Sequence, residues 1–102
     1  GNSAFRIESV LGENGRYTVI GKARVFEAVM HYAVSDGHDV LDEQMVVLDA
    51  GAPAWAPFEL NIEIPKEKLP VNGTLMVELF EYSAKDGSRV NEWFVVLEKF
   101  ES

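Results

Sequence analysis

Carboxylates gather in the middle of this sequence at a spacing that could bind a metal ion. The four residues are Asp36, Asp39, Asp42 and Glu43. Calcium takes about six to eight oxygen ligands, which these side chains and nearby loop carbonyls could supply. The segment lacks the Asp-x-[Asp/Asn]-x-[Asp/Asn]-Gly pattern of an EF-hand loop, and on a strand residues 36 and 42 would point away from 39 and 43. We interpret the segment as a solvated, negatively charged hairpin and expect no metal and no cofactor.

Two histidines, His31 and His38, are the remaining candidates for metal ligands or bases. A catalytic zinc site needs about three protein ligands with a supporting second shell, and the chain has no cysteine that could complete one. Ser35, His31 and Asp36 could be combined into a Ser-His-Asp set, but no glycine-flanked nucleophile elbow supports it. We therefore expect no catalytic residues and no enzymatic activity.

An aromatic pair, Trp55 and Phe58, flanks Pro57 where a long loop leads into a strand. One interpretation is a hydrophobic plug that closes one end of the fold, because aromatic side chains bury large areas. The other is an exposed platform for a sugar or a peptide. The loop, residues 51–57, holds small residues and two prolines, and such stiffening lowers the entropy lost on docking. A protease inhibitor that presents this loop is therefore an alternative function.

The charge balance argues against nucleic acids and membranes as partners. The chain has 17 acidic and 9 basic residues and a formal net charge of −8. No Lys or Arg lies between Arg24 and Lys66, and such an acidic stretch repels phosphate backbones and anionic lipid. No apolar run approaches the roughly 20 residues that span a bilayer. We expect neither nucleic-acid binding nor direct membrane insertion.

The elements that must position these side chains are strands. From Phe26 to Val34 every second residue is apolar, which is typical of a strand buried on one face. We predict that Val19–Val34 forms the central strand and that the segment before Gly21 is its antiparallel neighbour. Gly21 itself indicates a bulge or a close backbone approach. A helical stripe at residues 28–33, with good helix formers at 41–45, is the competing interpretation.

Turn signals about every ten residues divide the chain into seven predicted strands, which indicates an all-β, two-sheet antiparallel sandwich. The approximate ranges are 4–10, 17–20, 22–35, 40–48, 58–64, 74–83 and 90–100. With 102 residues, of which 47% are hydrophobic, we expect a single domain spanning residues 1–102. The predicted core residues are Phe26, Tyr32, Phe58, Leu60, Ile62, Leu75, Val77 and Val95.

Short segments that recur in a fixed order connect the chain to a known family. They are Gly21–Glu27 (GKARVFE), Asp36–Gly37, Trp55-x-x-Phe58 and Phe80–Gly87 (FEYSAKDG). This set resembles the immunoglobulin-like domain of bacterial spore-germination proteins, the module found beside GerMN domains in Gram-positive lipoproteins. The resemblance implies an immunoglobulin-like sandwich at the bacterial cell envelope, outside the cytoplasm, with a binding or spacer role and no catalysis.

The resemblance implies that this chain is part of a larger lipoprotein that contacts a protein or a cell-wall component. The family has no agreed catalytic residues to carry over. From the residues themselves, the candidate contact positions are Trp55 and Phe58 on the long loop and Asp36 and Asp39 in the acidic hairpin.

Overall fold

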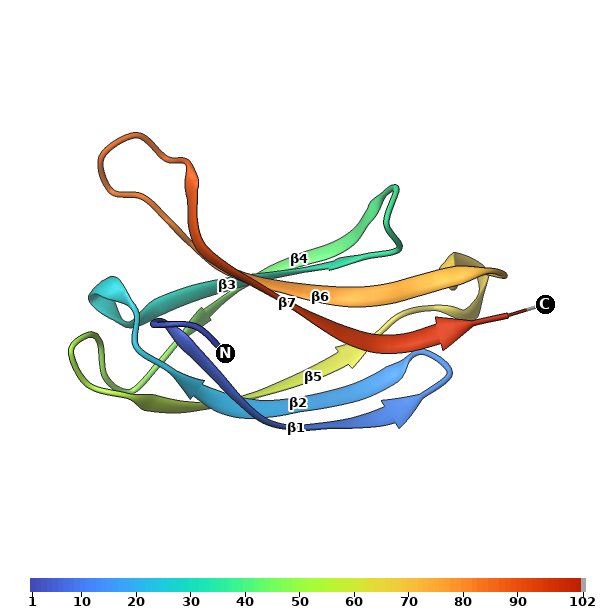
Figure 1. The fold of residues 1–102 in the computed structure, drawn as a ribbon, viewed down its shortest axis with the longest axis horizontal. Coiled ribbons are helices and arrows are strands. Elements are labelled where there is room, and N and C mark those ends of the chain that lie inside the picture. Colours follow the sequence, from blue (N-terminus) through green and yellow to red (C-terminus); the bar gives the residue numbers. More distant parts are fainter. Residues whose placement is uncertain (102) are drawn as a thin grey trace.

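In the computed structural model, which describes residues 1–101, seven strands follow one another along the chain. They are β1 (Phe5–Glu13), β2 (Arg16–Ala23), β3 (Val29–Ser35), β4 (Val40–Val47), β5 (Ala56–Glu63), β6 (Gly73–Tyr82) and β7 (Arg89–Phe100). One antiparallel sheet has the order β1-β2-β5 and the other the order β4-β3-β6-β7. Figure 1 shows the two sheets as stacked layers. The predicted all-β sandwich of two antiparallel sheets and about seven strands is confirmed.

Alternation along the strands builds the core between the two sheets. In β5 the buried residues alternate strictly with exposed ones, so Phe58, Leu60 and Ile62 face inward while Glu59 and Asn61 face solvent. This is the pattern expected of a strand with one buried face. In β3 and β4 the backbone is likewise extended, so the helical interpretation of residues 28–33 and 41–45 is wrong.

The prediction of one central strand from Val19 to Val34 is wrong. β2 ends at Ala23 and β3 begins at Val29, and the two strands lie in different sheets. β2 therefore pairs with β1 and β5, and β3 pairs with β4 and β6. Between them lies a short 3-10 turn, Phe26–Ala28, which carries the chain from one sheet to the other. A hydrophobic alternation that happens to continue through the turn misled the prediction.

The turn between β2 and β3 is set by backbone conformation and by one carboxylate. Glu27 and Ala28 both adopt positive φ, at 55° and 60°, which reverses the direction of the chain. The backbone N–H of Phe26 donates to the Glu81 carboxylate at 2.9 Å. As a result the Phe26 ring points outward with 62% of the residue exposed, and its prediction as a core residue is wrong.

Gly21 lies inside β2, opposite Ile7 of β1 and Phe58 of β5. A Cβ at this position would overlap the Arg6 carbonyl oxygen and approach Phe58 Cζ to 2.9 Å. The predicted close backbone approach is therefore confirmed. The irregularity in pairing falls on the partner strand, between Ile7 and Ser9 of β1.

Most of the predicted core residues are confirmed, although the prediction missed some buried side chains. Val95 is only partly buried, because β7 lies at the edge of its sheet. Phe5 and Phe80 are fully buried and were not predicted. The confirmed core residues are Tyr32, Phe58, Leu60, Ile62, Leu75 and Val77.

Candidate contact site at the loop end of the sandwich

Two irregular segments meet at one end of the sandwich, on the left in Figure 1: the turn at residues 24–28 and the loop at residues 51–55. The Val25 carbonyl accepts hydrogen bonds from Ala52 N–H at 2.7 Å and from Ala28 N–H at 3.4 Å. A Cβ on Gly51 would lie 2.8 Å from the Ala28 nitrogen, so only glycine allows the segments to approach so closely. We call this region the loop end.

Trp55 lies at the loop end and is half-buried. The Arg6 and Arg24 Cζ atoms lie 4.2 Å and 4.8 Å from the centroid of its ring, within the range of a cation–π interaction. Arg24 is held in place because its Nε and Nη2 atoms donate to the Ser3 carbonyl at 3.2 Å and 2.9 Å. Trp55 is thus neither fully buried, as a hydrophobic plug would be, nor fully exposed, as an open binding platform would be, because two guanidinium groups cover part of its ring.

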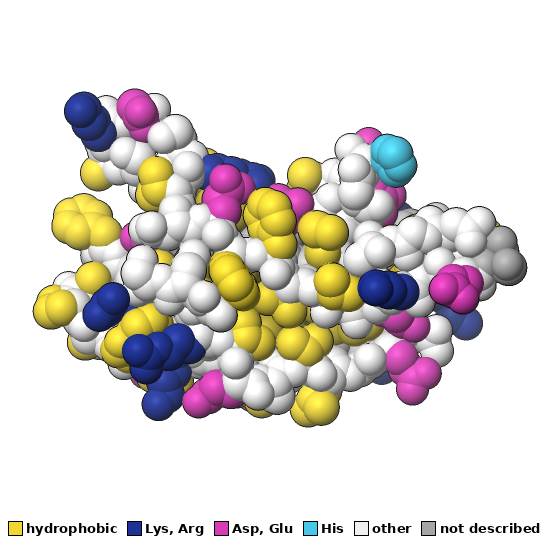
Figure 2. Space-filling view, viewed as in Figure 1, with side chains coloured by type: hydrophobic (Ala, Val, Ile, Leu, Met, Phe, Trp, Pro, Cys, Tyr) yellow, Lys and Arg dark blue, Asp and Glu magenta, His cyan; other side chains and the backbone are white. Residues whose placement is uncertain are grey.

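A third cation joins this group. Lys22 of β2 stands directly opposite Arg6 of β1 in the pairing register, and both residues are exposed. Figure 2 shows dark-blue Lys and Arg side chains gathered over the starts of β1 and β5 and the end of β2. We call Arg6, Lys22, Arg24 and Trp55 the arginine–tryptophan patch.

A hollow of about 450 Å³ opens beside the patch, and Arg24 lines both. Phe26, with its exposed ring, lines another side of it. The Glu81 carboxylate lies at the hollow but is already occupied, since it accepts from Phe26 N–H at 2.9 Å and from Asn91 Nδ2 at 2.6 Å. Among the groups that line this loop-end pocket, the Arg24 guanidinium keeps N–H donors that Ser3 does not use, and the Phe26 ring is exposed. Its complete lining is Ser3, Ala4, Arg24, Phe26, Ala52, Pro53, Glu81 and Asn91.

Phe58 follows Trp55 by three residues but faces the interior. It is 5% exposed, so its prediction as a core residue is confirmed. A side chain buried to this extent offers almost no surface to a partner, and Phe58 does not contribute to the contact site.

The acidic hairpin lies at the opposite end of the molecule, on the right in Figure 1. The Asp36 carboxylate accepts from the backbone N–H groups of Asp39 at 2.7 Å and His38 at 2.9 Å. These hydrogen bonds hold the pKa of Asp36 below its ordinary value. The carboxylate closes its own turn, and the structure does not bring Asp36 or Asp39 near Trp55. Within residues 1–101, no group of three or more His, Asp or Glu side chains is arranged to hold a metal ion.

The Ser-His-Asp combination is not assembled. His31 and Ser35 share one face of β3 four residues apart, which separates them by about 13 Å along a strand. The His31 ring stacks on Phe80 with centroids 5.7 Å apart and meets Tyr82 edge-on at 4.6 Å. The Ser35 hydroxyl instead accepts a hydrogen bond from Gly37 N–H at 3.0 Å. These contacts give both residues structural roles.

Arg89 forms a second charged cluster, on the outer face of the four-stranded sheet. It pairs with Glu78 at 2.8 Å and Glu43 at 3.3 Å, and its Cζ lies 3.9 Å from the Phe80 centroid. Burial alone would lower the pKa of Arg89, but the hydrogen bond and charge of Glu78 outweigh it and raise that pKa. This cluster satisfies its own charges and covers a buried ring.

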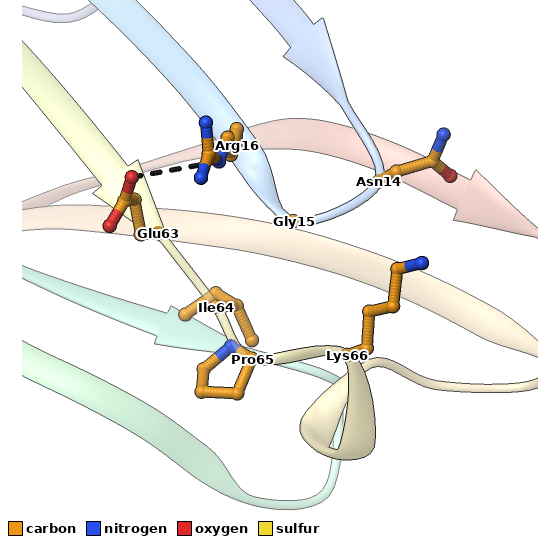
Figure 3. A pocket seen from close by; sticks show the side chains of 7 residues that line it. All are labelled: Asn14, Gly15, Arg16, Glu63, Ile64, Pro65 and Lys66. Carbon is orange, nitrogen blue, oxygen red and sulfur yellow. Dashed lines mark ion pairs between the residues drawn. The ribbon is translucent and has the colours of Figure 1, made fainter.

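A second hollow, of about 400 Å³, lies where β5 ends, and Figure 3 shows its lining. Arg16 and Glu63 form an ion pair across it at 3.6 Å, with both side chains largely exposed. Lys66 extends away from this pair in Figure 3. None of its lining residues is aromatic, and its guanidinium already has a counter-charge. This hollow therefore has fewer groups that could bind a partner than the loop-end pocket has.

The sequence reasoning missed Arg6, Lys22, Arg24 and Phe26 as site residues. A signal for two of them was present, because Lys22 and Arg24 alternate with small residues, a spacing that predicts side chains on one face of an extended chain. Arg6 and Trp55 come from separate segments of the chain, and only the pairing of β1 with β2 and of β2 with β5 brings them together.

Comparison with known protein families gives a match over most of the chain. Residues 9–88 match the family model described as the immunoglobulin-like domain of bacterial spore germination. Neither the curated proteins nor the solved structures contain a significant match. In the part of the chain that the structure describes, no helix has the length and apolar character needed to cross a membrane.

Proposed function

This chain belongs to the family of immunoglobulin-like domains of bacterial spore germination, and we propose that it is a non-enzymatic contact domain of a cell-envelope protein. In this proposal the loop end binds a cell-wall component, or a protein of the envelope, outside the cytoplasm. The domain would belong to a larger lipoprotein and hold it at its site of action.

The exposure of Phe26 beside the loop-end pocket is the observation that carries the proposal. Its backbone is fixed by Glu81 at 2.9 Å, in a turn with two residues at positive φ. A large apolar ring that the fold holds outward, 62% exposed, loses the free energy of burial unless a partner covers it. Trp55 is a second aromatic surface near the pocket, because Arg24 both contacts the Trp55 ring and lines the pocket.

A non-catalytic role agrees with the groups found at the loop end. Glu81 is the one carboxylate that lines the pocket, and its hydrogen bonds to Phe26 and Asn91 already engage both of its oxygens. No histidine or aspartate lines the pocket. The pocket therefore has groups suited to binding, but no acid–base pair of the kind that general catalysis uses.

The alternative of a protease inhibitor gains little support from the loop at residues 51–57. A loop that pairs with a protease in a substrate-like way needs a run of extended backbone. Here Ala54 N–H donates to the Gly51 carbonyl at 3.1 Å, which closes a tight turn. Limited proteolysis combined with a protease assay tests this alternative. A single slow cleavage that blocks the protease would favour the inhibitor, whereas cleavage without inhibition would exclude it.

Co-sedimentation with purified peptidoglycan at moderate salt tests the proposed function. We expect the wild-type domain in the pellet, and Trp55→Ala and Phe26→Ala in the supernatant. The matched control is Phe94→Ala, which removes an equally exposed ring (56%) from the outer face of the other sheet. Circular dichroism shows whether each variant is folded. If the wild type stays in the supernatant, or if Phe94→Ala loses binding as Phe26→Ala does, the loop end is not a wall-binding site.

A further inference from the structure

We propose that the ligand of the loop end is an anionic cell-wall polymer, whose phosphate or carboxylate groups bind Arg6, Lys22 and Arg24. This inference rests on the proposed function and specifies the chemistry of its ligand. It follows from the way in which the fold distributes its few positive charges.

The four arginines divide into two classes. Arg16 pairs with Glu63 at 3.6 Å, and Arg89 pairs with Glu78 at 2.8 Å. Arg6 and Arg24 have no ion pair among residues 1–101. Both lie instead over the ring of Trp55, at 4.2 Å and 4.8 Å. The chain has 17 acidic residues, yet these two neighbouring guanidinium groups have no carboxylate partner in the part of the chain that the structure describes. This differs from Arg16 and Arg89, which both pair with glutamates.

Lys22 adds a third positive charge, whose repulsion destabilises the domain when no ligand is bound. It stands directly opposite Arg6, where side chains are about 5 Å apart, and it precedes Arg24, just past the end of β2, by two residues. Like charges directly opposite each other in a sheet are destabilising. A bound oxyanion would remove this repulsion, so the patch gains more from an anion than an isolated lysine would.

The guanidinium of Arg24 is preorganised to receive an oxyanion. Its Nε and Nη2 atoms donate to the Ser3 carbonyl, which fixes the plane of the group and leaves its other N–H donors free. A fixed guanidinium binds phosphate or carboxylate through two parallel hydrogen bonds. Because Arg24 also lines the loop-end pocket next to Phe26, an anionic group bound there can place an attached sugar against an aromatic ring.

The acidic hairpin would orient a polymer rather than exclude it. The acidic hairpin that contains Asp36 and Asp39 lies at the other end of the sandwich. Electrostatic repulsion at that end and attraction at the loop end would direct a polyanion to one end only. The net charge of −8 therefore opposes non-specific binding of anions while leaving this local site intact.

The test compares two variants that remove the same charge from opposite ends of β5. Arg6→Gln/Arg24→Gln alters the patch, and Lys66→Gln/Lys68→Gln alters exposed lysines after the end of β5. Binding is measured on cell walls that retain their phosphodiester-linked polymers and on walls from which acid has stripped them. We expect the first variant to bind at least about tenfold more weakly and the second to bind as the wild type does. Raising the salt should weaken wild-type binding.

The two wall preparations identify the source of the anion. Loss of binding on stripped walls assigns it to phosphodiesters, and unchanged binding assigns it to peptidoglycan carboxylates. Arg6→Lys/Arg24→Lys keeps both charges but loses the paired N–H donors of the guanidinium groups, so it should recover only part of the binding that Arg6→Gln/Arg24→Gln loses. If Arg6→Gln/Arg24→Gln binds as tightly as the wild type while Trp55→Ala does not, the anionic ligand is refuted and the proposed function stands. If the wild type binds neither preparation, both the anionic ligand and the wall-binding form of the proposed function fail.

Discussion

Replacing Tyr17 by phenylalanine tests a connection between the two sheets at the end far from the loop end. The Tyr17 hydroxyl on β2 donates to Glu98 Oε1 on β7 at 2.6 Å and accepts from Gly15 N–H at 3.1 Å. Asn14 N–H donates to the same Glu98 oxygen at 2.8 Å. One hydroxyl therefore joins the β1–β2 turn to the edge strand of the other sheet.

The expected cost of Tyr17→Phe at pH 7 is about 1.5–3 kcal/mol of unfolding free energy, the range for a hydrogen bond to a charged group. Burial, followed by the hydrogen bond to Glu98, raises the pKa of Tyr17 to about 12 from 10.0. The pKa of Tyr17 in the folded state lies above its pKa in the unfolded state. The stabilisation that the neutral Tyr17 hydroxyl provides is therefore fully present below pH 10 and is lost as the pH rises from 10 to about 12. Two pKa units correspond to about 2–3 kcal/mol.

The assay is urea unfolding followed by tryptophan fluorescence, from pH 7 to pH 11, for the wild type and Tyr17→Phe. The difference in unfolding free energy should be constant up to about pH 10 and shrink above it, which separates Tyr17 from other groups that titrate in alkali. Tyr82→Phe is the control, because Tyr82 is 42% exposed and should cost about 0.5 kcal/mol or less. A difference at pH 7 below about 0.5 kcal/mol for Tyr17→Phe would refute the inter-sheet connection.

Two further substitutions test the packing. Leu60→Ala removes a side chain that is 2% exposed and should cost about 2–5 kcal/mol in urea unfolding; a loss below about 0.5 kcal/mol would mean that the inward face of β5 is misassigned. Gly21→Ala places a methyl group 2.9 Å from Phe58 Cζ and against the Arg6 carbonyl, so it should cost about 1–3 kcal/mol. An unchanged melting temperature for Gly21→Ala would show that β1 and β2 can separate at no cost.

Local patterns in the sequence were sufficient for most of the strands and for the inward faces of β3, β5 and β6. In β5, alternation between apolar and polar residues over Phe58–Ile64 predicts both the strand and its buried side chains, because side chains alternate along any extended chain. Asp36-Gly37 likewise predicts the hairpin, since the Asp36 carboxylate and a glycine at φ 94° close the turn within a few residues.

The same local pattern failed at the passage from one sheet to the other. Residues 26–34 alternate as a strand would, but the alternation begins in the turn, where Phe26 is exposed and Val25 is buried. The conformation of this turn depends on Glu81, which lies on β6 and is 55 residues away from Phe26 in sequence. A pattern of neighbouring residues carries no information about such a distant hydrogen-bond partner.

At the candidate site, too, some features follow from the sequence alone and others only from the tertiary structure. The sequence by itself determined that Trp55 follows a small-residue loop, that Lys22 and Arg24 are spaced two residues apart, and that the chain is acidic. Only the tertiary structure decided that Arg6 and Arg24 both lie on Trp55 and that the acidic hairpin lies at the other end. The physical reason is that side-chain direction is set by the backbone within a strand, whereas the meeting of β1, β2 and the loop before β5 is set by pairing between distant segments.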